Sequence, residues 1–163
     1  MRGTQLVFAQ RGATFAEVLV SMTLLLIGLM GAMGSYQAAE RGLRASQLAT
    51  RALAMAESRI ETKRSARWDR LLVDDLDDDG VPDLVMRDDG QGDDAQAGDA
   101  IYTGSWDHDG VHVIWTVAPS RPGSLATAGY VGLEARATYV TSGGPREVRI
   151  GTLRANPVFV GSH

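Results

Sequence analysis

The most constraining feature of this chain is an uncharged run of 22 residues, Val18–Ala39, with a single acid, Glu17, immediately before it. At 1.5 Å per residue, a helix of this length is about 33 Å long, close to the roughly 30 Å hydrocarbon core of a bilayer. An unpaired carboxylate in hydrocarbon costs roughly 2.5–3.5 kcal/mol on insertion scales, so Glu17 needs a partner or a function. The combination indicates a membrane-length helix whose acid takes part in assembly.

The residues around this acid form a motif. Residues 11–17 read Arg-Gly-Ala-Thr-Phe-Ala-Glu, so a basic residue and a glycine close a short polar leader. This stretch resembles the leader signal of type IV pilins and pseudopilins, in which a Lys or Arg and a Gly usually precede Phe-Thr-Leu-x-Glu. Ala13 departs from the usual Phe, and an aromatic residue follows at Phe15. The resemblance implies that a membrane prepilin peptidase cuts after Gly12 and methylates the new amine of Ala13.

The resemblance extends to about residue 60 and is closest to PilV-type minor pilins. It rests on Glu-Val-Leu-Val from Glu17, on Gly-Leu-Met-Gly from Gly28 and on the run Leu53–Arg59. It implies a minor pilin that is held in the inner membrane and then built into a type IV pilus, where Glu17 pairs with the terminal amine of a neighbour. The implied partners are the major pilin, other minor pilins, the inner-membrane assembly platform and a large tip adhesin.

We expect the chain to divide into four segments. Residues 1–12 form the cleaved leader, and residues 13–39 form the membrane and assembly half of one long helix, because this region lacks proline and is rich in good helix formers. Residues 40–66 form the amphipathic half of the same helix, with an apolar stripe between arginines. Residues 67–163 form a β-rich head that carries an acidic loop over 74–99.

Alternation of apolar and polar residues predicts an antiparallel sheet in the head. Val111, Val113 and Trp115 face one side of their segment, whereas His112 and Thr116 face the other, as is typical of a strand with one buried face. Asp-Gly and Ser-Gly-Gly-Pro sequences supply turns between consecutive segments. The expected strands are 84–86, 101–106, 111–118, 130–141 and 147–153. Because the stripe of the helix is the available cover, the expected fold is an α+β pilin roll: a long N-terminal spine helix packed on a small antiparallel β-sheet.

All fourteen Asp residues lie between positions 69 and 109. Within this segment, acids occupy positions 1, 3, 5 and 9 of a loop with glycine at position 6, which is the spacing of a calcium loop. The proposed ligands are Asp75, Asp77, Asp79, Val81 through its carbonyl, and Asp83. The loop is no standard EF-hand, because Met86 stands at position 12 and a strand rather than a second helix follows. Repulsion among the carboxylates of residues 74–79 favours a bound cation, and a solvated acidic turn is the alternative.

Several other classes of protein find no support in the composition. The chain has no Cys, so it forms no disulfide, and its three histidines lack zinc-site spacing. Neither a nucleophile-elbow motif nor a phosphate loop is present, so we expect no enzymatic activity. The net charge of −4 gives no reason to expect nucleic-acid binding. Two alternatives to a pilus subunit stay open: a type II secretion pseudopilin, and a membrane-tethered, calcium-dependent binding module that retains residues 1–12.

Overall fold

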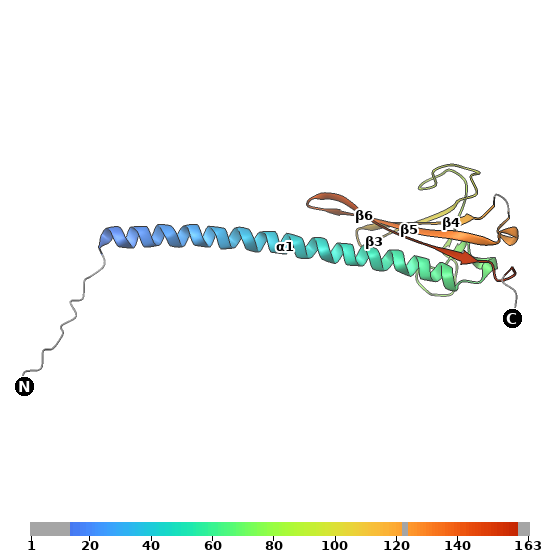
Figure 1. Cartoon of the computed structure of the whole chain (residues 1–163), viewed down its shortest axis with the longest axis horizontal. Coiled ribbons are helices and arrows are strands. Elements are labelled where there is room, and N and C mark those ends of the chain that lie inside the picture. The colour runs from blue at the N-terminus through green and yellow to red at the C-terminus, as the bar shows by residue number, and fades with distance from the viewer. Residues whose placement is uncertain (1–13, 122–123, 160–163) are drawn as a thin grey trace, which may run out of the picture. The chain divides into compact units, whose positions relative to one another are not determined.

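The computed structural model describes residues 14–121 and 124–159. Its elements in chain order are α1 (Phe15–Ser65), η1 (Trp68–Arg70), β1 (Val73–Asp74), β2 (Leu84–Val85), β3 (Tyr102–His108), β4 (Val111–Pro119), η2 (Leu125–Thr127), β5 (Tyr130–Thr141) and β6 (Gly144–Ala155). One long N-terminal helix packs through its C-terminal part on antiparallel strands, which confirms the α+β prediction (Figure 1).

Helix α1 continues through 51 residues without interruption. The segment contains no proline, and Lys63 and Arg64 lie in its last turn, where positive side chains interact favourably with the helix dipole. The chain divides into two compact units, one that ends at Leu43 and one that begins at Arg44, and α1 passes through both. The first unit contains only α1 among its described residues, and the second contains the rest of α1 and the head.

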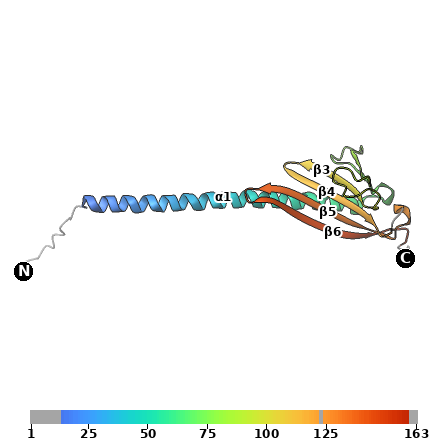
Figure 2. The same ribbon diagram turned by 90° about the horizontal axis from the view of Figure 1, so that it is seen from above.

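The main sheet has four antiparallel strands in the order β3–β4–β5–β6 (Figure 2). The turn between β3 and β4 is made by Asp109 and Gly110, whose φ angles of 50° and 76° are the left-handed values that a two-residue hairpin requires. Strand β6 begins at Gly144, earlier than the expected residue 147, because the tight turn after Thr141 lets it pair along the whole of β5. The predicted hairpins are therefore confirmed. The second turn contains only Ser142 and Gly143, whereas the expected turn residues Gly144 and Pro145 belong to β6, which is longer than expected.

A second, two-stranded sheet was not fully anticipated. Strand β1 pairs with β2 through Val73↔Val85 and Asp74↔Leu84. Strand β2 was expected as residues 84–86, but β1 has only two residues and lies at the edge of the acidic segment. A strand this short has no period that alternation could reveal. Its position matters because residues 75–83, the part of the expected 74–99 loop that is called the acidic loop below, leave β1 and return into β2.

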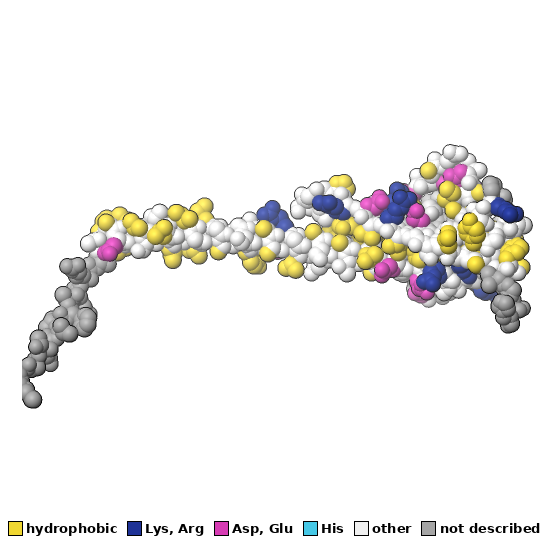
Figure 3. Space-filling model, viewed as in Figure 1, with side chains coloured by type: hydrophobic (Ala, Val, Ile, Leu, Met, Phe, Trp, Pro, Cys, Tyr) yellow, Lys and Arg dark blue, Asp and Glu magenta, His cyan; other side chains and the backbone are white. Residues whose placement is uncertain are grey.

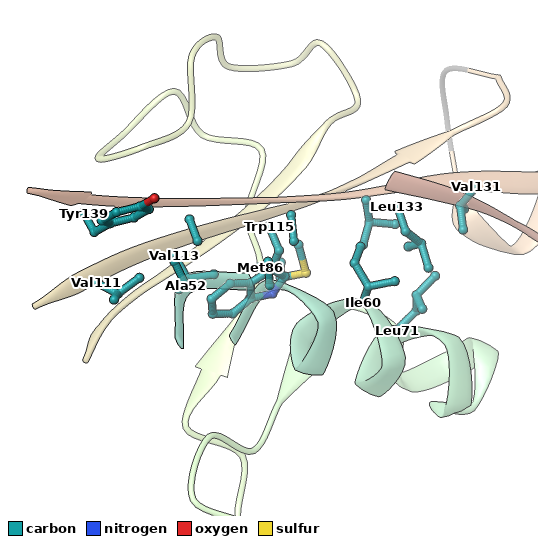
Figure 4. Packing of buried hydrophobic residues seen from close by; sticks show 14 residues of the cluster. Ala52, Ile60, Leu71, Met86, Val111, Val113, Trp115, Val131, Leu133 and Tyr139 are labelled. Carbon is teal, nitrogen blue, oxygen red and sulfur yellow. The ribbon is translucent and has the colours of Figure 1, made fainter. Parts of the chain in front are cut away.

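The core lies between the C-terminal part of α1 and the inner face of the main sheet. Ala52 and Ala56 are fully buried, and their small side chains let the helix backbone come close to the strands. Figure 4 shows Ile60 of the helix facing Leu133, with the ring of Trp115 nearby. The inward residues of β4 are all at most 1% exposed: Val111, Val113, Trp115 and Val117. Full burial of a large apolar side chain contributes about 1.5–3 kcal/mol, so this predicted face holds the head together.

Candidate functional site

The first candidate site is the start of α1, where Thr14 and Glu17 bond each other reciprocally. The Glu17 carboxylate accepts from the Thr14 backbone N–H at 3.0 Å and from its hydroxyl at 3.3 Å. In return, the Glu17 backbone N–H donates to Thr14 Oγ1 at 3.3 Å. This is a capping box, which satisfies donors that a helix start otherwise leaves unpaired. The isolated chain therefore gives the Glu17 carboxylate local partners.

The helix that follows this box exposes its apolar side chains. Within the first unit, the large hydrophobic residues between Val18 and Tyr36 are 50% to 75% exposed. Figure 3 shows hydrophobic side chains gathered along this part of α1. By length and composition, α1 is a candidate membrane-spanning helix. The predicted processing residues, Gly12 and Ala13, lie outside the described residues.

The second candidate site is the acidic loop between β1 and β2. Carboxylate oxygens of Asp75, Asp77 and Asp83 all lie within 4.8 Å of one another. Gly80 has a φ of 87°, the left-handed conformation that lets the loop turn back sharply. Three of the five predicted ligands are thus brought together, in a group that could hold a metal ion.

The fourth predicted carboxylate, that of Asp79, is placed differently. Asp79 lies outside the group, and its Oδ1 accepts the backbone N–H of Val81 at 2.7 Å. Backbone N–H groups also occupy part of the other carboxylates: Gly80 donates to Asp75 at 2.7 Å, and Leu76 donates to Asp83 at 2.7 Å. The loop conformation is therefore supported by its own hydrogen bonds.

A buried ion pair anchors the start of this loop. Lys63 Nζ of α1 lies 2.8 Å from Asp74 Oδ2, and both side chains are at most 2% exposed. Lys63 also donates to the Leu71 carbonyl at 2.7 Å, and Trp115 Nε1 donates to Asp74 Oδ2 at 2.9 Å. Burial lowers the pKa of Lys63, against the attraction of Asp74. Asp74 therefore points into the head, and the repulsion within the loop comes from the acids that follow it.

Arg59 adds a second cation beside this pair. Its guanidinium lies 5.2 Å from the centre of the Trp106 ring and 5.6 Å from that of Trp115, within the range of cation–π attraction. Arg59 Nη1 and Asp74 Oδ1 are buried and have no hydrogen-bond partner among the described residues. Sequence reasoning missed this cluster, because Asp74 reaches Lys63 only where the chain turns back after α1, and the two tryptophans beside Arg59 come from the distant strands β3 and β4. The sequence offered one signal of it: Lys63 lies on the apolar face of α1 after Ile60, where a charged residue needs a buried partner.

A third cluster is centred on His112, on the outer face of the sheet. Through Asp93 it joins the sheet to residues 87–101, which lie between β2 and β3. His112 Nδ1 lies 2.8 Å from Asp107 Oδ1, and its Nε2 lies 3.2 Å from Asp93 Oδ1. Burial alone would lower the pKa of His112, but hydrogen bonds to the two carboxylates outweigh it and raise the pKa above its ordinary value. Alternation placed His112 on the outer face correctly, but did not identify these partners.

No protein-family model, curated protein or solved structure matches this chain significantly.

Proposed function

We propose that this chain is a pilin-like subunit, of the minor-pilin kind, that is anchored in the inner membrane by α1 and then built into a type IV pilus. The observation that carries the proposal is the Thr14–Glu17 capping box at the head of an exposed apolar helix. A capping box serves helices of any kind, but this carboxylate also stands at the end of an exposed apolar helix of membrane length. There it can pair with a neighbouring chain, which a subunit that must find one axial position needs and an ordinary anchor does not.

On this proposal, Glu17 changes partners during assembly. In the membrane-held subunit, Thr14 and the helix dipole stabilise the carboxylate. After cleavage behind Gly12, the terminal ammonium of a neighbouring subunit becomes a stronger partner, because an oppositely charged group in low dielectric attracts the carboxylate more than the uncharged donors of Thr14 do. Leaving either charge alone in hydrocarbon costs several kcal/mol, so one axial register is favoured.

The N-terminal mass of the chain purified from membranes and from sheared filaments tests this proposal. We expect a methylated Ala13 as the first residue in filaments. Chains that keep residues 1–12 in the assembled material would refute the register mechanism and favour a membrane tether. Co-purification with secretion components instead of pilus components would assign the chain to the pseudopilin alternative.

We further propose that the acidic loop binds calcium through Asp75, Asp77 and Asp83, with Asp79 and the Val81 carbonyl joining after a local rearrangement. The support is the convergence of three carboxylates on one point, which suits a hard cation with oxygen ligands. Bound calcium would fix the loop in a head that has no disulfide.

Thermal unfolding of the full chain with calcium and with chelator tests the calcium proposal. We expect calcium to raise the unfolding temperature of the wild type and to have little effect on Asp77→Asn. The matched control is Asp78→Asn, which removes the same charge from the same loop at a position outside the carboxylate group. Asp78 has a φ of 60°, which Asn tolerates well. An equal calcium response in both variants would contradict the assignment.

A further inference from the structure

The outer face of the main sheet carries a groove that neither proposed site uses. It has a volume of about 610 Å³ and lies between residues 93–101 and the outward side chains of β4, β5 and β6. Figure 1 shows the β2–β3 connection on the side of the sheet opposite to α1. All of its lining residues belong to the second unit. The groove is within the size range of binding sites in proteins.

The floor of the groove is hollow because small residues meet on neighbouring strands. Ala118, Gly132 and Leu153 are paired across β4, β5 and β6, and Gly151 lies diagonally from Gly132. Two glycines at this point leave space that side chains would otherwise fill. The apolar borders are exposed, with Ile101 at 36% and Leu153 at 72%. An aliphatic side chain from outside would bury apolar surface on this floor.

The walls of the groove carry an excess of negative charge. Asp93, Asp94 and Asp99 line the side formed by the connecting segment. On the opposite side, Arg149 lies 2.6 Å from Glu134 and Arg136 lies 3.9 Å from Glu147, so each lining arginine is paired with a glutamate. Asp93 is itself paired with His112 at 3.2 Å, which leaves Asp94 and Asp99, among the described residues, as the unpaired negative charges of this wall. The charge that remains along the connecting segment suits a positively charged partner.

The acidic wall is preformed. Asp88 accepts the backbone N–H groups of Gly98, Asp99 and Ala100, at 2.5 Å, 3.2 Å and 2.9 Å. Asp94 accepts the Gly90 N–H at 2.6 Å from within the same segment. A wall that is already ordered loses little conformational entropy when a ligand binds.

We propose that this groove binds an extended segment of a partner protein in which an aliphatic side chain is flanked by Lys or Arg. The aliphatic side chain lies on the floor at Gly132, between Ile101 and Leu153. The flanking cations face the wall that carries Asp94 and Asp99. This role is independent of how α1 is anchored or assembled.

The full chain, reconstituted in nanodiscs of zwitterionic lipid, tests the proposal. The probe is a fluorescently labelled Lys-Leu-Lys peptide with Gly and Ser flanks, compared with Glu-Leu-Glu and Lys-Ser-Lys peptides in the same flanks. Gly132→Val fills the floor, and a Cβ there meets neighbouring atoms only at 3.8 Å or more. Gly129→Val is the matched control, since a Cβ at Gly129 meets no atom within 4 Å and the residue does not line the groove.

We expect fluorescence anisotropy to show that the Lys-Leu-Lys peptide binds the wild type more tightly than either comparison peptide. Gly132→Val should weaken binding about tenfold or more, a change of about 1.4 kcal/mol, and Gly129→Val should leave it unchanged. Asp99→Asn should weaken it in proportion to the lost charge. Undetectable binding, or equal binding by Gly132→Val, would overturn the proposal. So would a dimer of the full chain that Gly132→Val dissociates, because a second copy would then fill the groove.

Discussion

Replacing Lys63 by Met removes one partner of a buried ion pair while keeping a long, flexible side chain. Lys63 and Asp74 are 2.8 Å apart and at most 2% exposed, so the remaining carboxylate would be left in the core with the Trp115 N–H as its side-chain donor. Breaking such a pair costs about 3–5 kcal/mol. At roughly 4 °C per kcal/mol for a domain of this size, the unfolding temperature should fall by roughly 12–20 °C.

Thermal unfolding of the full chain in detergent, followed by near-ultraviolet circular dichroism, measures this change at the tryptophans. Arg64→Met is the matched control on the next residue, because Arg64 pairs with Glu61 at the surface, where both side chains are more than half exposed. Exposed pairs contribute about 0–1 kcal/mol, so this variant should unfold near the wild-type temperature. A Lys63→Met protein as stable as Arg64→Met would refute the view that the ion pair anchors β1 to α1.

Two further predictions concern the head. Arg154→Leu should destabilise it by about 1–3 kcal/mol in chemical denaturation, because Arg154 donates to the carbonyls of Lys63 and Ala66 at the end of α1; an unchanged midpoint would contradict this capping role. Because folding raises the pKa of His112, this residue stabilises the folded head fully below about pH 6.5, its ordinary pKa. The stabilisation is lost as the pH rises through the pKa of His112 in the folded protein. The free energy of unfolding of the wild type should therefore exceed that of His112→Gln most at acidic pH. A difference in unfolding free energy that grows above pH 8 would contradict this prediction.

The sheet could be predicted because alternation acts over several residues at once. From Val111 to Val117 every second side chain is buried, so the pattern specified both the strand and its inner face. The turn at Asp109 and Gly110 was predictable because these residue types adopt left-handed φ at low cost. Gly104 shows the limit of this reasoning: a Cβ there would lie 3.0 Å from the Trp115 ring, a contact visible only in three dimensions.

The candidate sites were predictable to different degrees. The spacing of the acids identified Asp75, Asp77 and Asp83, because a turn of this length brings alternate side chains together. The spacing did not separate Asp79 from them, although its carboxylate lies outside the group. Glu17 could be identified because it is the acid immediately before the apolar run. Its partner Thr14 was overlooked, although a Thr three residues before a Glu is the signature of a capping box.

The most direct test of the pilin-like assignment is the incorporation of Glu17→Gln into filaments. Glutamine can replace glutamate in a capping box, so this variant keeps the helix start with Thr14 and loses only the charge. Quantitative immunoblotting of sheared filaments and of membranes, with wild type and Thr14→Ser as controls, measures the fraction assembled. We expect normal membrane levels and cleavage, with strongly reduced incorporation of Glu17→Gln alone. Wild-type incorporation of Glu17→Gln would contradict the claim that a negative charge at this position sets the register of the subunit.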